Sequence, residues 1–314
     1  SRMQSLVTVC GFLLLIFSVH ANVRPDFKVC VFLYFHKRKL NDKPVSGSHC
    51  CLFLRYAEMH QVLLQKNGAR PADLPTPRQH LYYFATLYDT ARRIPVYSAY
   101  KFEKSDKCAR ENRWFVEPQV HHTCLYNMMT AEDLMKKHPV DLESVGQKQA
   151  VNDDYNGLIK SGYNRGHLNP KLHHATFTLT NVVPQNADLN GGSWKKYEET
   201  LKIILANCRE AYVLVGAIPS EKNWVKNRVN IPDYLWHAFC CLNNNGKPFK
   251  NGAAIAKNDK NGKVQECSLD SLQKFLKAGK LFFDNCKAPS NTGEGDCASV
   301  HFTDYNSNST NSLN

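Results

Sequence analysis

Apolar runs rich in β-branched and aromatic residues recur along the chain and are separated by polar turns. Such runs predict β-strands, because these side chains pack well on a pleated, half-buried surface. The run between residues 211 and 218 is apolar almost throughout, which is typical of a buried strand. We expect strands over residues 27–35, 80–88, 94–100, 177–183, 211–218, 234–241 and 253–256.

Other segments carry signals of helices. Apolar side chains recur at helical spacing in residues 52–66 and 269–277. Thr130 is a suitable N-cap because two acidic residues follow it in the first turn. Because strands and helices do not alternate regularly, we expect the α+β fold class and not a doubly wound α/β sheet. The expected helices are residues 52–66, 130–137, 142–150, 194–207 and 269–277.

The two ends of the chain differ from its middle. The apolar run from Leu6 to Val19 lies between Arg2 and Ala21, and it predicts a signal peptide over residues 1–21. A membrane anchor is the alternative, but the run is too short for an ordinary span and no later run qualifies, so we expect no membrane span. Residues 288–314 are rich in Ser, Asn and Gly and predict a disordered polar tail. The remainder, residues 22–287, is expected to be one secreted domain.

Cysteine content and charge agree with a secreted protein. Removal of residues 1–21 takes away Cys10 and leaves eleven of the 12 cysteines. In an oxidising compartment they imply several disulfides and one thiol that is free or intermolecular. Neither the pairing nor the oligomeric state follows from the sequence. The formal net charge of +12 attracts polyanions such as nucleic acid, heparin or anionic membranes, although many secreted proteins are basic without such a partner.

Residues 163–198 hold the densest set of side chains that can do chemistry. Histidine titrates near neutral pH, so His167 can take a proton from water. Arg165 lies two residues earlier on an extended segment, and side chains at this spacing point to the same face of a strand. Its positive charge can meet the negative charge that develops on phosphorus at the same site. Gly166 between them allows a close approach to the backbone.

Further polar residues follow the same pattern. Asn181 interrupts an expected strand, where an amide is disfavoured and therefore informative. Asn190 precedes a helix, and its amide oxygen can bind Mg²⁺, while Glu198 in that helix can hydrogen-bond metal-bound water. Arg93 lies at a turn, where it either solvates the turn or grips substrate phosphate. For each residue alone the ordinary alternative is structural, since His on a strand is commonly at the surface and Asn beside Gly commonly makes a turn.

Four motifs together carry a resemblance to a known family. They are Tyr163-Asn164-Arg165-Gly166-His167-Leu168, Thr180-Asn181-x-x-Pro184-Gln185, Leu189-Asn190-x-x-x-Trp194 and Glu198. This set resembles the signature of the DNA/RNA non-specific endonucleases of the ββα-metal superfamily. Residues 84–88, 93–100 and 238–241 in their cysteine-rich setting more narrowly resemble the secreted endonuclease domain-containing 1-like proteins of vertebrates. The resemblance covers roughly residues 27–287.

The resemblance implies a ββα-metal fold in which helices flank a central antiparallel sheet, stapled here by disulfides. It implies Mg²⁺, or Mn²⁺ in its place, as the cofactor, and DNA and RNA as the partners. His167 would be the general base, and Asn190 would be the direct metal ligand. Glu198 would orient metal-bound waters.

The same resemblance implies three further roles. Arg165 would stabilise the pentacovalent phosphorus, and Asn181 would position groups around His167. Arg93 is an additional candidate for contact with substrate phosphate. Family members cut without base specificity, which suits contacts made mainly to phosphate.

Two features depart from the family's pattern. Position 164 is Asn where the family commonly has Asp, so a charge is lost beside the site. Residues 52–78 look like an addition, either an insertion or an artefact of the gene prediction. Three hypotheses follow: a secreted Mg²⁺-dependent nuclease that cuts DNA and RNA, a nuclease-fold protein that binds polyanions with little or no cleavage, and a disulfide-stapled extracellular structural protein. The intact set of site residues favours the first.

Overall fold

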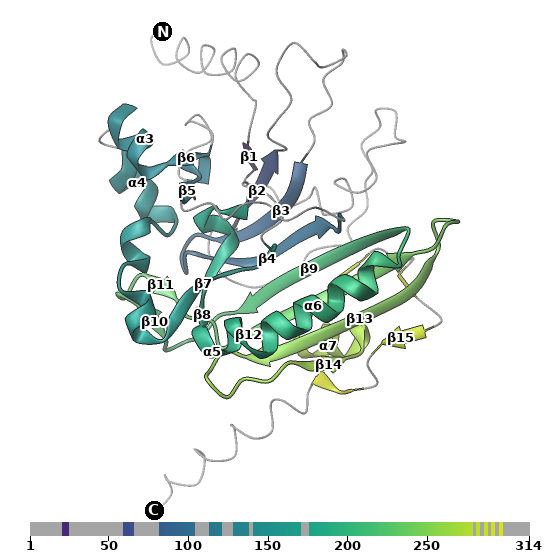
Figure 1. Ribbon diagram of the computed structural model, residues 1–314. Coiled ribbons are helices and arrows are strands. Elements are labelled where there is room, and N and C mark those ends of the chain that lie inside the picture. The colour runs from purple at the N-terminus through teal and green to yellow at the C-terminus, as the bar shows by residue number, and fades with distance from the viewer. Residues whose placement is uncertain are drawn as a thin grey trace, which may run out of the picture.

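A computed structural model shows the chain as a large, mainly antiparallel sheet with helices packed against it (Figure 1). The structure describes residues 21–24, 59–65, 82–103, 113–120, 128–137, 141–170, 176–278, 281–282, 286–287, 290–292 and 295–297. Within these ranges nine strands form one sheet in the order β1-β2-β3-β4-β9-β12-β13-β14, with β15 added in parallel beside β13. The α+β class expected from the sequence is therefore confirmed.

The strands of this sheet are β1 (Ala21–Arg24), β2 (Met59–Gln65), β3 (Tyr82–Asp89), β4 (Ile94–Lys101), β9 (Glu210–Ile218), β12 (Tyr234–Leu242), β13 (Pro248–Lys257), β14 (Gln265–Cys267) and β15 (Ser290–Thr292). Three small hairpin-like pairs lie outside it: β5 (Phe115–Val116) with β6 (Met129–Thr130), β7 (Tyr163–His167) with β8 (Val182–Asn186), and β10 (Trp224–Val225) with β11 (Val229–Asn230). The α-helices are α3 (Ala131–Lys137), α4 (Asp141–Lys148), α5 (Ala187–Gly191), α6 (Ser193–Ala206) and α7 (Leu269–Phe275). The 3₁₀ helices are η1 (Pro118–Val120), η2 (Asn152–Tyr155), η3 (Leu158–Ser161) and η5 (Leu179–Asn181).

The long strands β9 and β12 are buried on both faces of the sheet. Along β9, Val213 and Val215 belong to the hydrophobic cluster that includes the buried face of α6. Tyr212 and Leu214 belong to a second cluster, which includes the buried face of α7. Because side chains alternate between the faces of a strand, a strand covered on both sides needs apolar residues at nearly every position. This requirement explains the uninterrupted apolar run over residues 211–218.

Helix α6 covers β9, β12 and β13 on one face of the sheet (Figure 1). Its buried side chains, which include Trp194, Tyr197 and Leu201, recur every three or four residues and form a single stripe. The Tyr197 hydroxyl group lies 3.3 Å from Nδ1 of His237 on β12. Burial lowers the pKa of His237 from 6.5 to about 3, so a neutral imidazole is part of the contact between helix and sheet.

Three disulfides connect the described parts of the chain, namely Cys208–Cys241, Cys240–Cys286 and Cys267–Cys297. Cys240 and Cys241 are neighbours on β12, so their side chains point to opposite faces of the sheet. Cys241 therefore binds the segment that follows α6 on one face. Cys240 binds the C-terminal segment on the other face, and the two bonds hold both layers to the same strand.

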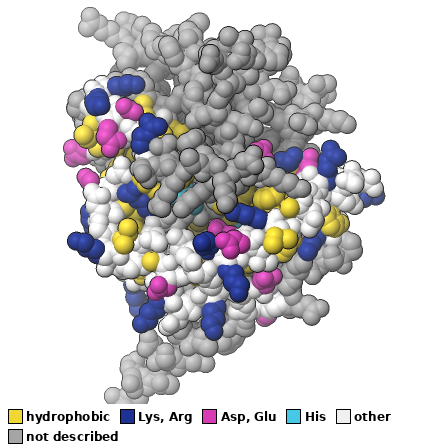
Figure 2. All heavy atoms as spheres, viewed as in Figure 1, with side chains coloured by type: hydrophobic (Ala, Val, Ile, Leu, Met, Phe, Trp, Pro, Cys, Tyr) yellow, Lys and Arg dark blue, Asp and Glu magenta, His cyan; other side chains and the backbone are white. Residues whose placement is uncertain are grey.

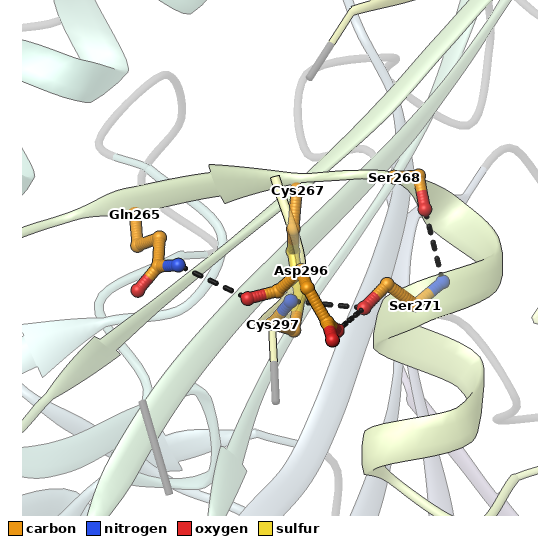
Figure 3. Close-up of a disulfide and its surroundings, with 6 residues drawn as sticks. All are labelled: Gln265, Cys267, Ser268, Ser271, Asp296 and Cys297. Atoms are coloured by element: carbon orange, nitrogen blue, oxygen red, sulfur yellow. Dashed lines mark hydrogen bonds between the residues drawn. A yellow bond between two sulfur atoms is a disulfide. The ribbon is translucent and has the colours of Figure 1, made fainter. Parts of the chain in front are cut away.

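The Cys267–Cys297 disulfide joins the end of β14 to the C-terminal segment beside α7 (Figure 3). Ser271 donates a hydrogen bond to Asp296 Oδ1 (2.5 Å) and accepts one from the backbone N–H of Cys297 (2.9 Å). Residues 290–292 form β15, which pairs with β13. These parts of the expected disordered tail are thus folded against the sheet, because a covalent bond and backbone pairing hold them there. The rest of that tail lies outside the described residues.

Most of the expected elements agree with the structure. Five expected strands correspond to β3, β4, β9, β12 and β13; they were expected over residues 80–88, 94–100, 211–218, 234–241 and 253–256. Four expected helices correspond to α3, α4, α6 and α7; they were expected over residues 130–137, 142–150, 194–207 and 269–277. No helix in the described ranges is both long enough and apolar enough to cross a membrane.

Two expected elements are wrong, in whole or in part. Residues 59–65, within the helix expected over residues 52–66, form β2 instead, because pairing with β3 overrides the local spacing of apolar residues. Within the strand expected over residues 177–183, η5 occupies residues 179–181 and β8 begins only at Val182. The expected signal sequence before Ala21, the strand over residues 27–35 and the loop over residues 67–78 lie outside the described residues.

Replacement of both Cys208 and Cys241 by Ser should destabilise the fold by about 3 to 4 kcal/mol, because the bond closes a loop between residues 33 positions apart. Thermal unfolding of the oxidised protein measures the effect. Asn207→Ser, at the exposed position beside Cys208, is the control and should leave the melting temperature nearly unchanged. An unchanged melting temperature in the double variant would contradict the stabilising role of this bond.

Candidate active site

The four motifs of the sequence meet at the β7–β8 hairpin. The strands pair antiparallel, with Tyr163 opposite Asn186 and His167 opposite Val182. Helices α5 and α6 follow β8 directly, so the order of elements is strand, strand, helix. α5 packs against both strands of the hairpin.

Position 166 has room only for glycine, because a side chain on the partner strand fills the space that a Cβ atom would occupy. A Cβ atom at position 166 would lie 2.2 Å from Oε1 and 2.5 Å from Cβ of Gln185. Gln185 is almost fully buried, so it has little room to move. The sequence predicted a close approach to the backbone here, and the structure identifies the approaching group as the Gln185 side chain.

Arg165 and His167 lie against the same aromatic side chain. The Arg165 guanidinium carbon is 4.7 Å from the ring centroid of Trp114, and the His167 ring is 5.3 Å from that of Trp114. Tyr155 also contacts Arg165, at 5.1 Å, and Phe177 meets the His167 ring edge-on at 5.0 Å. The structure therefore brings the candidate cation and the candidate base together on one side of β7.

These aromatic neighbours determine the electrostatics of the pair. Burial lowers the pKa of Arg165 below its ordinary value, while Tyr155 acts in the opposite direction. A guanidinium group nevertheless keeps its charge in proteins. His167 is 9% exposed, so its ring is held in place and largely shielded from bulk water. A charge in such surroundings interacts more strongly with a substrate phosphate than it would in water.

Asn181 is fully buried, and its side-chain amide is saturated by protein groups. Its Oδ1 accepts hydrogen bonds from Ser98 Oγ (2.9 Å) and from the backbone N–H of Asn169 (3.0 Å). Its Nδ2 donates to the backbone carbonyls of Asn169 and Thr176, both at 3.1 Å. The Asn181 carbonyl also accepts from the backbone N–H of Leu168 at 2.9 Å. Asn181 thus anchors the turn immediately after His167 to strand β4.

Glu198 lies beside the same strand. Burial raises the pKa of Tyr100 well above its ordinary value, and the Glu198 carboxylate raises it further. The half-buried Glu198 therefore lies within electrostatic range of Tyr100. Ser98 and Tyr100 are two residues apart on β4, so they point to the same face at a spacing of about 7 Å. Asn181, which is bonded to Ser98, and Glu198, which is within electrostatic range of Tyr100, are thus both linked to this face of β4.

Asn190 lies in α5, the short helix that precedes α6, and it is half-buried. Among the described residues, no three His, Cys, Asp or Glu side chains are grouped so that they could hold a metal ion. The Asn190 amide oxygen and the Glu198 carboxylate are the oxygen donors that the sequence predicted for this region, and oxygen donors suit Mg²⁺, which takes few protein ligands and keeps most of its waters.

Arg93 has a different setting from the other candidates. It occupies the β3–β4 turn with a left-handed backbone (φ 55°). Its guanidinium group donates to the carbonyls of Gly146 (3.2 Å), Gln147 (2.9 Å) and Arg228 (3.1 Å). These bonds join the turn to the end of α4 and to the β10–β11 segment, which is a structural role. Contact between Arg93 and substrate phosphate stays a prediction.

Several residues of the site were not found from the sequence. Trp114 and Tyr155 hold Arg165, yet both lie in segments without a recognisable motif. Ser98 offered one weak signal, because it is a small polar residue inside an otherwise apolar strand. Tyr100 and Asn169 become recognisable only when the chain segments are brought together in space.

Replacement of Gly166 by Ala should destabilise the protein by about 1 to 3 kcal/mol, because the new methyl group overlaps Gln185. Chemical denaturation measures the change. Gly191→Ala is the matched control, since a Cβ atom there meets nothing within 4 Å. Equal stability of the Gly166 and Gly191 variants would show that Gln185 moves aside without cost.

Comparison with known proteins agrees with the motifs. The family model described as DNA/RNA non-specific endonuclease matches residues 73–289. Endonuclease domain-containing 1 protein is 32% identical in Homo sapiens over 217 residues and 34% identical in Mus musculus over 214 residues, in each case 65% of this chain and 41% of the relative. The mitochondrial nuclease EXOG of Xenopus laevis is 26% identical over 235 residues, 66% of this chain and 58% of the relative.

Among solved structures, a chain of the EndoG/EndoGI complex aligns with a TM-score of 0.44 and 20% identity, over 66% of this chain and 85% of that chain. The match to the curated human and mouse relatives spans about two fifths of their length. The family match covers well over half of the present chain and includes every motif at the β7–β8 hairpin. The chain belongs to the DNA/RNA non-specific endonuclease family.

Proposed function

We propose that the chain is a secreted, Mg²⁺-dependent endonuclease that hydrolyses phosphodiester bonds of DNA and RNA. The observation that carries the proposal is the contact of Arg165 and His167 with the ring of Trp114. Membership of the non-specific endonuclease family supports the choice of nucleic acid as substrate. The three disulfides support an oxidising location, in agreement with the expected signal peptide.

The proposed mechanism assigns a separate task to each side chain. His167 takes a proton from the attacking water, and the rings of Trp114 and Phe177 hold its imidazole in one orientation. Arg165 places positive charge where negative charge develops on phosphorus. Asn181 does not touch the substrate in this scheme, because its amide is already saturated, and it fixes the turn that follows His167.

Asn190 and Glu198 would hold the metal ion. Asn190 would offer its amide oxygen as a ligand, and Glu198 would orient coordinated waters by hydrogen bonds. When bound, the metal ion would supply positive charge that stabilises the leaving oxygen.

Replacement of His167 by Ala should lower the rate of plasmid and RNA cleavage in Mg²⁺ by at least about 100-fold, because the general base is removed. A chelator should abolish cleavage by the wild-type chain, and added Mg²⁺ or Mn²⁺ should restore it. Lys196→Ala, which removes an exposed charge from α6, is the control for altered surface charge. Cleavage at equal rates by the wild-type and His167 variants would refute the proposal, provided that both melt at the same temperature.

A second candidate function is the binding of polyanions without cleavage. Asn164 favours it, because the family commonly has a carboxylate at this position. Lys and Arg side chains are spread over the face of the molecule shown in Figure 2, among Asp and Glu. The net charge of +12 gives this surface an attraction for any polyanion.

Replacement of Asn164 by Asp separates the two functions. Asn164 lies opposite Gln185 in the hairpin, and Gln185 Nε2 is buried without a hydrogen-bond partner in the described part of the chain. Asn164 has one acceptor oxygen, whereas a carboxylate has two and makes stronger hydrogen bonds, so Asp at position 164 can accept from Gln185 Nε2 in either orientation and steady the strand that carries His167. We expect cleavage to rise about fivefold, the equivalent of one hydrogen bond of about 1 kcal/mol.

Rates of cleavage and salt-dependent DNA binding are measured together for both proteins. A protein that only binds would lose affinity steeply as salt rises and would show no turnover with either residue at position 164.

A further inference from the structure

A carboxyl group is buried behind the candidate active site and has no part in the mechanism above. Glu117 lies between β5 and η1 and is fully buried. Its Oε1 accepts a hydrogen bond from Thr178 Oγ1 at 3.2 Å, and the hydroxyl groups of Thr178 and Thr180 are 3.1 Å apart. Its Oε2 is buried and has no hydrogen-bond partner within the described ranges. The described side chains around it offer hydroxyl groups.

The backbone around Glu117 is fixed as firmly as its side chain. The amide of Gln149, which follows α4, accepts a hydrogen bond from the Glu117 N–H (2.9 Å) and donates one to the Glu117 carbonyl (2.6 Å). Gln149 is itself fully buried. These two bonds fix the backbone of Glu117, so the segment that carries the carboxyl group cannot move towards solvent without breaking them.

Burial raises the pKa of Glu117 from 4.5 to about 8, although hydrogen bonds from Thr178 and Thr180 oppose the shift. At neutral pH the carboxyl group accordingly carries a proton. The charged and titratable groups on the described elements nearest to this region include Tyr88, Arg165 and His167. Elements β1 and α4 also pack against η1, and the described charged side chains of α4 include Glu143 and Lys148.

The hydroxyl groups that bind Glu117 belong to the turn that carries Asn181. The Asn181 N–H donates to the Thr178 carbonyl at 3.0 Å, and Asn181 in turn holds the residues after His167. The Phe115 N–H donates to the Phe177 carbonyl at 3.0 Å, and Phe177 packs on the His167 ring. Glu117 is thus connected to the candidate base by two routes, through Asn181 and through Phe177.

We propose that Glu117 is a positioning residue of the candidate active site: its protonated carboxyl group holds the Thr178–Thr180 turn, and through Asn181 and Phe177 this turn sets the orientation of His167. The inference rests on the proposed nuclease function. Loss of the proton would place an uncompensated negative charge in the apolar interior, and the turn would have to open to admit water or a cation.

The test compares the wild-type chain with Glu117→Gln across a range of pH. Glutamine keeps a hydrogen-bond acceptor at this position and carries no charge at any pH. We expect the ratio of the variant's kcat to the wild-type kcat on DNA in Mg²⁺ to rise about tenfold from about pH 6.5 to about pH 9.5, with KM little changed. The kcat ratio rises with pH because the wild-type chain loses the neutral form of Glu117 as pH rises through about 8, whereas the Gln variant stays neutral.

Thr178→Val provides a second variant in case Glu117→Gln does not fold. This change removes the hydrogen bond that holds the turn, and the same bond lowers the pKa of Glu117. We therefore expect kcat to be lower than in the wild-type chain at every pH, and the remaining fall in kcat to move to higher pH. Thr178→Ser, which retains the hydroxyl group, is the matched control and should keep the wild-type profile.

A kcat ratio that stays constant with pH, while the wild-type chain cleaves normally, would overturn the role of Glu117 alone. A wild-type chain that does not cleave at any pH would overturn the nuclease function and this inference with it. The two failures are therefore distinguishable in one set of measurements.

Discussion

The buried amide of Asn181 is the interaction on which the arrangement of the site depends. It bonds to Ser98 on the central sheet and to the backbone on both sides of the turn that follows β7. All of its hydrogen-bonding capacity is used inside the protein, and a buried amide left unsatisfied would cost about 1 to 3 kcal/mol. The turn after His167 therefore has one favourable geometry, which is fixed relative to a strand of the sheet.

The sheet can hold the site in this way because it is packed on both faces. Apolar side chains alternate between two hydrophobic clusters along β9 and β12, and α6 and α7 contribute to opposite clusters. The adjacent residues Cys240 and Cys241 also point to opposite faces, and each forms a disulfide with the layer on its own face. Strand β4 pairs directly with β9, so Ser98 and Tyr100 lie beside the most deeply packed part of the molecule.

Aromatic rings surround both the candidate base His167 and the positively charged Arg165. Trp114 contacts both Arg165 and His167, and Tyr155 packs on the guanidinium group. Behind these rings, the segment from Phe115 to Glu117 is paired with the turn that carries Asn181. The site is therefore built from four chain segments whose side chains shield the polar groups from water, and shielding strengthens every electrostatic interaction among them.

The sequence by itself determined the α+β class, most strands of the sheet and most helices that pack against it. It also placed five candidate site residues in one set of motifs, namely Arg165, His167, Asn181, Asn190 and Glu198. These features are local, since they depend on side-chain alternation, helical spacing and short intervals between residues. Pairing in space decided the rest. Backbone pairing with β3 made a strand of residues 59–65, and a disulfide and the β13 ladder ordered parts of the polar C-terminal segment. Only the tertiary structure could identify Trp114, Ser98 and Glu117 as neighbours of the site, because they lie at least 50 residues from His167 along the chain and their contacts depend on how distant segments pack.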